Sequence, residues 1–447
     1  MKLTDLLGGK QHHESPAEES LRQAQQAFVE GNYQEAVRFL TTGFQQDVDH
    51  QPLYPLAAKC LRELGGEAEV GLFDQAAQNP KSFQAFLDLG MFFQDLNHYD
   101  LAISFMEKAN KLNPRHLELA HDLAVAYARR FEVGKALDVL DKVGTHHDFW
   151  AFWFWLKLRI MTGQVSDGIT QGLDDLRSGL DEMEDSEELL IPRLKVEEVR
   201  EMLARYRLVG SPRQHIRDWH YIQYGSMILE FFESEGDFVA GGRHVASWGS
   251  REMIKAVALR LKRYLDACTM TFREVRYLED RDTVILGRLL AAVLELPGNP
   301  YDPGTESGHC LIVGANATDF DGHEELAHIR EGQVLFAFNQ SWLESATVTP
   351  DIIGLMSQFF SFPWDGGGLR IKGDDPAGGL ESIPADEREP EEIVAELLAL
   401  EVEETHDPAH LDFYLQHRDY LKAIGRLASD IRFNFMIESP VPGSRFA

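Results

Sequence analysis

The stretch FQAFLDLGMFFQDLNHYDLAISFMEKANKLNPRH, residues 83–116, decides the fold of the first part of the chain. It has small, aromatic and proline residues at the spacing expected for two packed antiparallel helices, namely Gly90, Phe93, Tyr99, Ala102, Ala109 and Pro114. Small residues allow two helices to approach closely, and a proline cannot continue a helix because it lacks the backbone N–H. The stretch therefore predicts a helix–turn–helix unit that ends near residue 114.

The same unit recurs along the chain at a nearly constant period. Residues 117–148 repeat the pattern with Ala124, Tyr127, Ala136 and Leu140. Residues 17–50 repeat it with Ala24, Ala27, Gly31, Asn32, Tyr33, Ala36 and Leu40. Two weaker copies, residues 51–82 and 149–184, keep part of the pattern. This pattern resembles the 34-residue tetratricopeptide repeat, and the resemblance implies a helical solenoid of about five helix pairs over residues 17–184.

In such repeats the first helix of every pair lines a concave groove, so the resemblance implies a protein or peptide partner there. The groove positions hold a mixture of apolar and polar residues: Leu21, Gln25, Phe28, Gln84, Leu87, Met91, Gln94, Glu118, His121, Val125 and Arg129. Some members of the family clamp a terminal carboxylate with Lys, Asn and Arg, whereas the matching positions here hold Leu21, Gln25 and Asp122. We therefore expect another kind of peptide. Alternatively, the C-terminal half of the protein itself fills the groove.

The charge of the chain limits its partners. It has 73 Asp and Glu residues against 43 Lys and Arg, a net charge of −30. A negative field of this size repels nucleic-acid phosphates and anionic lipids, so we expect neither nucleic acid nor membrane as a partner. No stretch approaches the roughly 20 apolar residues of a membrane span. Residues 1–16 lack the apolar core of a signal peptide, which predicts a cytoplasmic protein with a flexible N-terminus.

After residue 184 the periodicity changes. Residues 185–211 predict a capping helix, and residues 212–365 alternate between strand-like and helix-like segments. The expected strands are residues 271–278, 310–314 and 333–339, and the expected helices are residues 250–265, 283–296 and 350–360, the last capped by Thr349. This alternation predicts an α/β domain with a mostly parallel sheet.

The remainder of the chain has a different composition. Residues 366–407 are rich in Asp and Glu and predict an acidic linker with a short helix at residues 390–402. Residues 408–447 predict a C-terminal docking helix and a tail, because apolar residues recur at helical spacing from residue 410 to residue 435. The three cysteines, Cys60, Cys268 and Cys310, lie far apart among apolar neighbours, which predicts buried free thiols.

One turn of the α/β region has features of a small-molecule site. Residues 279–283, Glu-Asp-Arg-Asp-Thr, follow an expected strand and open an expected helix, at the strand end where α/β sheets bind ligands. Helix N-termini attract anions. Alternatively, Asp282 or Thr283 simply caps the helix. The candidate residues are Arg243, His244, Asp280, Asp282 and Thr283.

The order of elements over residues 241–297 resembles that of phosphoribosyltransferases, in which a glycine-rich turn and a helix precede a strand, a pyrophosphate loop and a second helix. The ribose-phosphate loop of that family is a strand that ends in paired acidic residues before a Thr/Gly-rich turn. Residues 311–316 and 336–341 lack this loop. The resemblance therefore implies a degenerate, non-catalytic copy.

Two hypotheses for the function follow. The first is a protein-interaction scaffold built on the repeats, with a non-catalytic α/β companion and no cofactor or metal. The second is an enzyme whose α/β domain acts on a small anionic substrate, such as a phosphate or nucleotide. The sequence favours the first, because it shows no nucleophile with its base, no CxxC or HExxH spacing and no phosphate-binding loop. It leaves the oligomeric state open.

Overall fold

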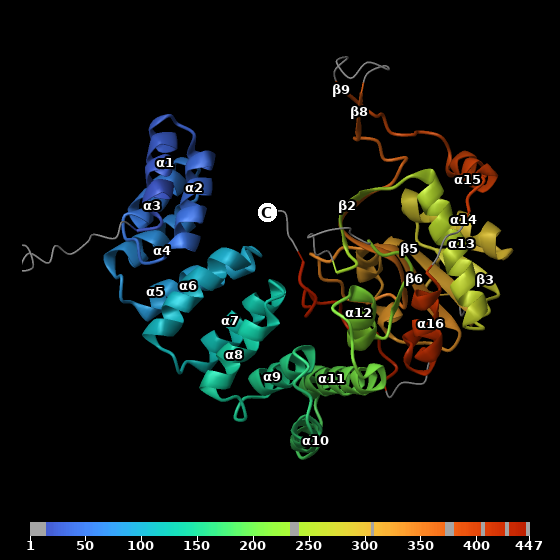
Figure 1. Ribbon diagram of the computed structural model, residues 1–447, viewed down its shortest axis with the longest axis horizontal. Coiled ribbons are helices and arrows are strands. Elements are labelled where there is room, and N and C mark those ends of the chain that lie inside the picture. The colour runs from blue at the N-terminus through green and yellow to red at the C-terminus, as the bar shows by residue number, and fades with distance from the viewer. Residues whose placement is uncertain are drawn as a thin grey trace, which may run out of the picture. The chain divides into compact units, whose positions relative to one another are not determined.

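The structure, a computed structural model, describes residues 15–232, 241–304, 308–371, 380–403, 407–424 and 429–443. The chain divides into two compact units, Met1–Leu158 and Arg159–Ala447. The first unit is helical, and the second combines helices with a parallel sheet (Figure 1). Among the described residues, no helix is both long enough and apolar enough to span a lipid bilayer.

The helices of the first unit form successive hairpins (Figure 1). They are α1 (Glu18–Val29) with α2 (Tyr33–Gln46), α3 (Leu53–Glu63) with α4 (Glu67–Gln78), α5 (Phe83–Asp95) with α6 (Tyr99–Leu112), and α7 (Leu117–Arg129) with α8 (Val133–Val143). Helix α9 (Phe149–Met161) crosses the boundary between the units. Small residues lie where the helices approach, and a Cβ added at Gly90 would come within 2.5 Å of the Met106 side chain.

The turns inside the hairpins are built alike. Each contains one residue with positive φ, namely Gly31, Gly65, Asn97 or Phe131, and Gly163 in the turn after α9 continues this series at intervals of 34 or 32 positions. In every turn, the backbone N–H of the next residue donates to the carbonyl five positions earlier, over 2.8 to 2.9 Å. This bond caps the free carbonyls of the first helix. The tetratricopeptide-type arrangement predicted from the sequence is therefore confirmed.

The second unit is built on a seven-stranded sheet with the order β1–β7–β6–β5–β3–β4, and β2 also pairs with β7. All of these pairs are parallel. The strands are β1 (Met227–Ile228), β2 (His244–Trp248), β3 (Glu274–Tyr277), β4 (Gly298–Pro300), β5 (Cys310–Asn316), β6 (Gln333–Gln340) and β7 (Ile352–Ser361). Strand β6 is buried along its whole length, as expected for a parallel sheet covered on both faces.

The helices of the second unit are α10 (Asp167–Asp181), α11 (Leu190–Val209), α12 (Ile216–Tyr224), α13 (Arg251–Ala267), α14 (Arg281–Leu294), α15 (Pro390–Ala399) and α16 (Pro408–Gln416). Helices α13, α14 and α15 pack against one another, and α14 packs on β3 and β5. Helix α11 is fixed to α12 by Arg205, which is fully buried and donates to the carbonyls of Ile222 and Gln223 over 2.8 and 3.0 Å.

The helix expected at residues 350–360 is wrong, because these residues form β7. Both faces of the first half of β7 are buried, so its apolar residues do not alternate with polar ones and their pattern resembles that of a buried helix. Thr349 does not cap a helix. Its hydroxyl donates instead to the carbonyl of Phe433 over 2.7 Å.

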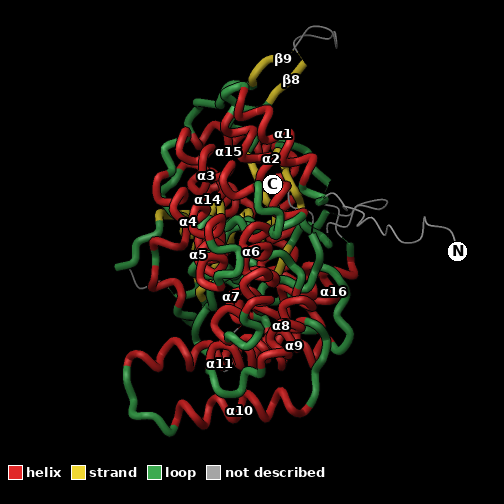
Figure 2. The backbone as a smooth tube through the Cα atoms, turned by 90° about the vertical axis from the view of Figure 1, so that its left-hand side faces the viewer, coloured by secondary structure: helices red, strands yellow, loops and turns green. Residues whose placement is uncertain are grey.

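The C-terminal helix expected to continue to residue 435 ends at Gln416. Beyond it the chain forms two short 3-10 turns, and Ile431 and Phe435 make isolated bridges to His328 and Ala346. The helical spacing of the apolar residues gave the wrong prediction here. Leu421, Phe433 and Phe435 are buried, but they belong to an irregular segment and not to a helix. The helix expected at residues 390–402 is present as α15, and β8 (Leu369–Ile371) with β9 (Leu380–Ser382) forms an antiparallel hairpin (Figure 2).

Candidate functional site

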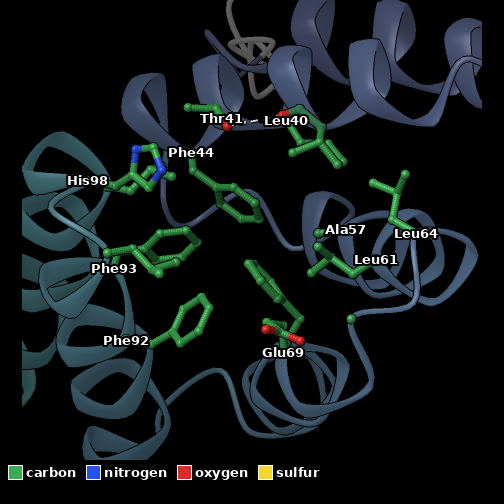
Figure 3. Close-up of a pocket in the computed structure, with 15 residues that line it drawn as sticks. Leu40, Thr41, Phe44, Ala57, Leu61, Leu64, Glu69, Phe92, Phe93 and His98 are labelled. Carbon is green, nitrogen blue, oxygen red and sulfur yellow. Dashed lines mark hydrogen bonds between the residues drawn. The ribbon is translucent and has the colours of Figure 1, made fainter.

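The clearest candidate site is an open apolar pocket of about 320 Å³ in the first unit (Figure 3). Its walls come from α2, α3, α4, α5 and α6. Most lining residues are leucine or phenylalanine: Leu40, Phe44, Leu61, Leu64, Phe73, Phe92, Phe93, Leu96 and Leu101. Leu64 and Leu96 are 45% and 52% exposed, so apolar surface at this pocket is in contact with water.

Aromatic rings form the inner part of the pocket. The rings of Phe44, Phe73 and Phe93 each lie 5.2 to 6.2 Å from the ring of Phe105. Phe44 belongs to α2 and Phe105 to α6, so the first hairpin contacts the third directly. In Figure 3, Phe44, Phe92 and Phe93 point into the cavity, and Leu61 lies across it. Phe44, Phe73 and Phe105 are buried, so aromatic side chains from α2, α4 and α6 pack together behind the cavity.

The second hairpin departs from the repeat pattern next to the pocket. The first residue of the second helix is apolar or aromatic in the other hairpins, namely Tyr33, Tyr99 and Val133. In the second hairpin this residue is Glu67, which is exposed. Gly66 and Glu69, on either side of it, line the pocket. We attribute the open space to this difference from the repeat pattern, since Glu67 is exposed and does not line the pocket.

Few polar groups reach the pocket. They belong to Thr41, Glu69 and His98. The Thr41 hydroxyl is already engaged, because it donates to the carbonyl of Val37 over 3.0 Å. An apolar cavity with a small number of polar groups at its margin is typical of binding sites. The arrangement is suited to holding apolar side chains, and nothing in it provides a nucleophile with a base.

The groove residues predicted from the sequence lie elsewhere, on α1, α5 and α7, and none of them lines the pocket. Leu21 is only 4% exposed and belongs to the core, so it is not available to a partner. The other predicted groove residues are at least partly exposed: Gln25, Phe28, Gln84, Leu87, Met91, Gln94, Glu118, His121, Val125 and Arg129. Among them, Arg129 donates to the Tyr99 hydroxyl over 2.5 Å. Their role stays a prediction.

The sequence analysis did not predict the pocket residues as a binding site, although the weak match of one hairpin to the repeat pattern was a sign of it. Residues 51–82 match the repeat only weakly, and this hairpin supplies Ala57, Leu61, Leu64, Gly66, Glu69 and Phe73 to the lining of the pocket. The pocket also depends on the contact between α2 and α6, two helices that are not neighbours in the repeat order. A period of 34 residues does not predict that contact.

In the α/β unit, the predicted turn at residues 279–283 does connect β3 to α14. The residue that caps the helix is Asp280, whose carboxylate accepts from the Thr283 N–H over 2.9 Å, rather than Asp282 or Thr283. The Thr283 hydroxyl accepts from the Ala315 N–H at the end of β5 over 2.9 Å. Asp319 lies close to both Asp280 and Thr283, and burial raises the pKa of its carboxyl.

This turn occupies a favourable place in the sheet. Strand β3 connects through α14 to β4 on one side, while β5 connects to β6 on the other. The carboxyl ends of two strands whose connections diverge form the usual ligand crevice of α/β sheets. The negative charge of Asp280 acts on both Asp282 and Asp319, and the one cation of the turn, Arg281, donates to the carbonyls of Asp386 and Arg388. Such an arrangement of carboxylates repels an anionic substrate.

The structure does not bring the other two candidates to this turn. Strand β2 carries His244 and is separated from β3 by β7, β6 and β5, which corresponds to roughly 19 Å at the usual strand spacing. Arg243 is 2% exposed, and its guanidinium donates to the carbonyls of Val441 and Pro442 over 3.1 and 3.3 Å. Burial lowers the pKa of His244 to about 4, so the ring is neutral at pH 7. Neither side chain supplies a positive charge for an anion at the turn.

The three cysteines are buried, and for two of them burial also changes the pKa. Cys60, Cys268 and Cys310 are buried thiols that form no disulfide, as predicted. Burial raises the pKa of Cys60 and of Cys268 to about 11, which makes both thiols unreactive at neutral pH. Within the described ranges, no three His, Cys, Asp or Glu side chains are grouped so that they can hold a metal ion.

Comparison with known protein families and with curated proteins finds no match. Among solved structures, the chain is similar to MamA of Desulfovibrio magneticus RS-1, with 17% identity and a TM-score of 0.23 over 38% of this chain and 97% of that chain. A TPR protein of Thermus thermophilus, TTC0263, has 16% identity and a TM-score of 0.22 over 41% of this chain and 98% of that one. YrrB, described as a TPR protein with an unusual peptide-binding site, has 17% identity and a TM-score of 0.21 over 36% and 85%.

Proposed function

We propose that this protein is an interaction scaffold whose helical repeats bind a partner protein through the pocket between α2, α3, α4, α5 and α6. The observation that carries the proposal is the open apolar cavity with its exposed leucines. Covering the exposed parts of Leu64 and Leu96 contributes about 1 kcal/mol each to binding. The packed rings behind them are fixed before a partner arrives, which lowers the entropic cost of association.

The concave face of the repeats is a second surface for the same function. Leu87 and Met91 on α5 and Val125 on α7 are partly exposed there. A longer partner can contact both surfaces, with the pocket as the anchoring point.

The alternative of an enzyme acting on a small anionic substrate gains no support from these contacts. At the turn before α14 the negative charge of Asp280 acts on Asp319, and Arg243 is committed to the C-terminal segment. The α/β unit is therefore part of the proposal only as a companion domain, for which we propose no chemistry.

Binding at the pocket can be tested with the full-length chain and a defined library of fluorescent 15-residue peptides, measured by anisotropy. Peptides that bind the unmodified protein should bind Leu64→Asp and Leu96→Asp at least tenfold more weakly, because each substitution places a charge in the apolar mouth. Leu112→Asp is the matched control, since Leu112 is also exposed but does not line the pocket. Circular dichroism verifies that each variant is folded. Unchanged affinities in both pocket variants would exclude the pocket as the binding site.

A further inference from the structure

Although the lining of the pocket is mostly apolar, several acidic residues lie at its margin. Four carboxylates at or next to lining positions have no basic partner among the described residues: Glu63, Glu67, Glu69 and Asp95. The two nearby arginines are already paired, Arg62 with Asp74 over 3.5 Å and Arg38 with Glu35 over 2.8 Å. The margin of the pocket therefore presents unopposed negative charge.

The helices that form the pocket carry the same excess. From the start of α2 to the end of α6, residues 33–112 contain eleven Asp or Glu and six Lys or Arg, a net charge of −5. Charges at the margin of an interface act mainly by selecting partners of opposite sign and by accelerating their approach. A cationic partner is therefore favoured, and an anionic one is repelled.

The size of the cavity limits what enters it. At about 320 Å³ it lies at the lower end of the range for ligand pockets, with room for one or two large apolar side chains. An extended peptide would bring unpaired backbone N–H and C=O groups against an apolar wall that offers them few partners. A helix satisfies these groups internally and presents apolar side chains at positions i and i+3 or i+4 on one face.

We propose that the pocket binds a basic amphipathic helix of a partner protein. Apolar side chains of that helix enter the cavity beside Leu64 and Leu96, and its Lys or Arg residues pair with Glu69 and the neighbouring carboxylates. This inference rests on the proposed function, because it specifies the partner of the same pocket. It places the docking site beside the turn of the second hairpin rather than in the concave groove.

Three synthetic 16-residue peptides test the proposal by fluorescence anisotropy with the full-length protein. The first has leucines at i, i+3 and i+7 flanked by Lys and Arg, the second has the same leucines flanked by Glu, and the third has the composition of the first in an order without periodicity. We expect the first to bind at least tenfold more tightly than either of the others. Its affinity should fall at least threefold between 50 and 500 mM NaCl, because salt screens the charge contribution.

Two charge variants separate the pocket from the overall charge of the protein. Glu69→Lys should weaken binding of the basic peptide at least fivefold, because Glu69 lines the pocket. Glu188→Lys changes the net charge equally, but Glu188 is an exposed residue directly before α11 that lines neither the pocket nor the predicted groove, so this variant should leave the affinity within twofold. Equal weakening by both variants would mean that the peptide responds to net charge alone, and the proposal would fail.

The remaining outcomes distinguish this proposal from the broader one. If the basic and acidic peptides bind equally and both are lost in Leu64→Asp, the pocket is a binding site and only the basic partner is wrong. If removal of residues 1–14 raises the affinity of the basic peptide tenfold, the pocket belongs to a segment of the chain itself. If light scattering shows a dimer that Leu64→Asp abolishes, the occupant is a second copy. Each of the last two results overturns the proposal.

Discussion

At the scale of single residues, Asp282 illustrates how folding changes the chemistry of a side chain. It lies in the first turn of α14 and accepts a hydrogen bond from the Trp364 indole N–H over 2.6 Å. Burial raises the pKa of its carboxyl from about 3.8 to about 6, the hydrogen bond from Trp364 opposes the increase, and the nearby Asp365 and Asp280 add to it. At neutral pH, Asp282 is therefore ionised in a place that disfavours its charge.

This shift predicts how stability depends on pH. Because the pKa in the folded state is higher than in the unfolded state, the folded protein binds the proton more tightly, and stability falls as pH rises from about 4 through about 6. Asp282→Asn removes the charge and keeps an acceptor for Trp364. It should raise the free energy of unfolding at pH 7.5 by about 1 kcal/mol, a value reduced for solvent screening. Below pH 4 the gain should disappear.

Urea unfolding at pH 4 and pH 7.5 measures this difference. Asp266→Asn is the control, since the side chain of Asp266 is 66% exposed and makes only a 3.6 Å surface ion pair with Lys262. The interpretation of Asp282 is wrong if Asp282→Asn and the control have the same effect at both pH values.

The turn that contains Asp282 also shows which residue-level features are readable from sequence. The sequence predicts that residues 279–283 follow a strand and open a helix, and the structure confirms that a helix starts there. The partner of Asp282 is 82 positions away, so neither the hydrogen bond nor the raised pKa follows from local sequence. The same is true of Arg243, whose acceptors Val441 and Pro442 lie about 200 positions further along the chain.

At the scale of secondary-structure elements, helices with a repeat were predictable and a strand with two buried faces was not. The repeat fixes the hairpins because small residues and turn residues recur at 34 and 32 positions. Strand β7 has no comparable signal, since apolar residues occupy both of its faces. Its one informative residue is Gly354, where an added Cβ would lie 2.4 Å from the carbonyl oxygen of Phe338 in β6.

That close approach gives a prediction for β7. Gly354→Ala should lower the free energy of unfolding of the α/β unit by about 2 kcal/mol, because the obstructing atom belongs to the backbone of a central strand and cannot move aside cheaply. Gly322→Ala is the matched control in the same unit, since a Cβ at Gly322 would meet no atom within 4 Å. Chemical unfolding of the full-length protein measures both. If Gly354→Ala lowers the free energy of unfolding no more than Gly322→Ala does, the close approach of β7 to the Phe338 carbonyl of β6 is wrong.

At the scale of the whole molecule, each compact unit has its own core. In the first unit the core is made by alanine, leucine and aromatic residues between the helices, and Leu40 is only 2% exposed. In the second unit the last part of the chain returns to the sheet. Arg432 is 2% exposed and pairs with the buried Asp351 over 2.7 Å, and it also donates to the carbonyls of Leu326, His328 and Gln333. The C-terminal segment is therefore an integral part of the α/β unit.

Differential scanning calorimetry of the full-length protein can show whether a substitution in the core of one unit lowers the unfolding temperature of that unit alone. Arg432→Ala leaves the carboxylate of Asp351 buried without its partner and three carbonyls without a donor, which should destabilise the second unit by about 3–5 kcal/mol. Leu40→Ala leaves a cavity in the first unit and should destabilise it by about 2–4 kcal/mol. We expect each variant to shift a different part of the heat-capacity profile, because the residues that each one disturbs belong to one core. Identical shifts of a single transition in both variants would mean that the chain unfolds as one cooperative body, with the stability of the repeats coupled to that of the sheet.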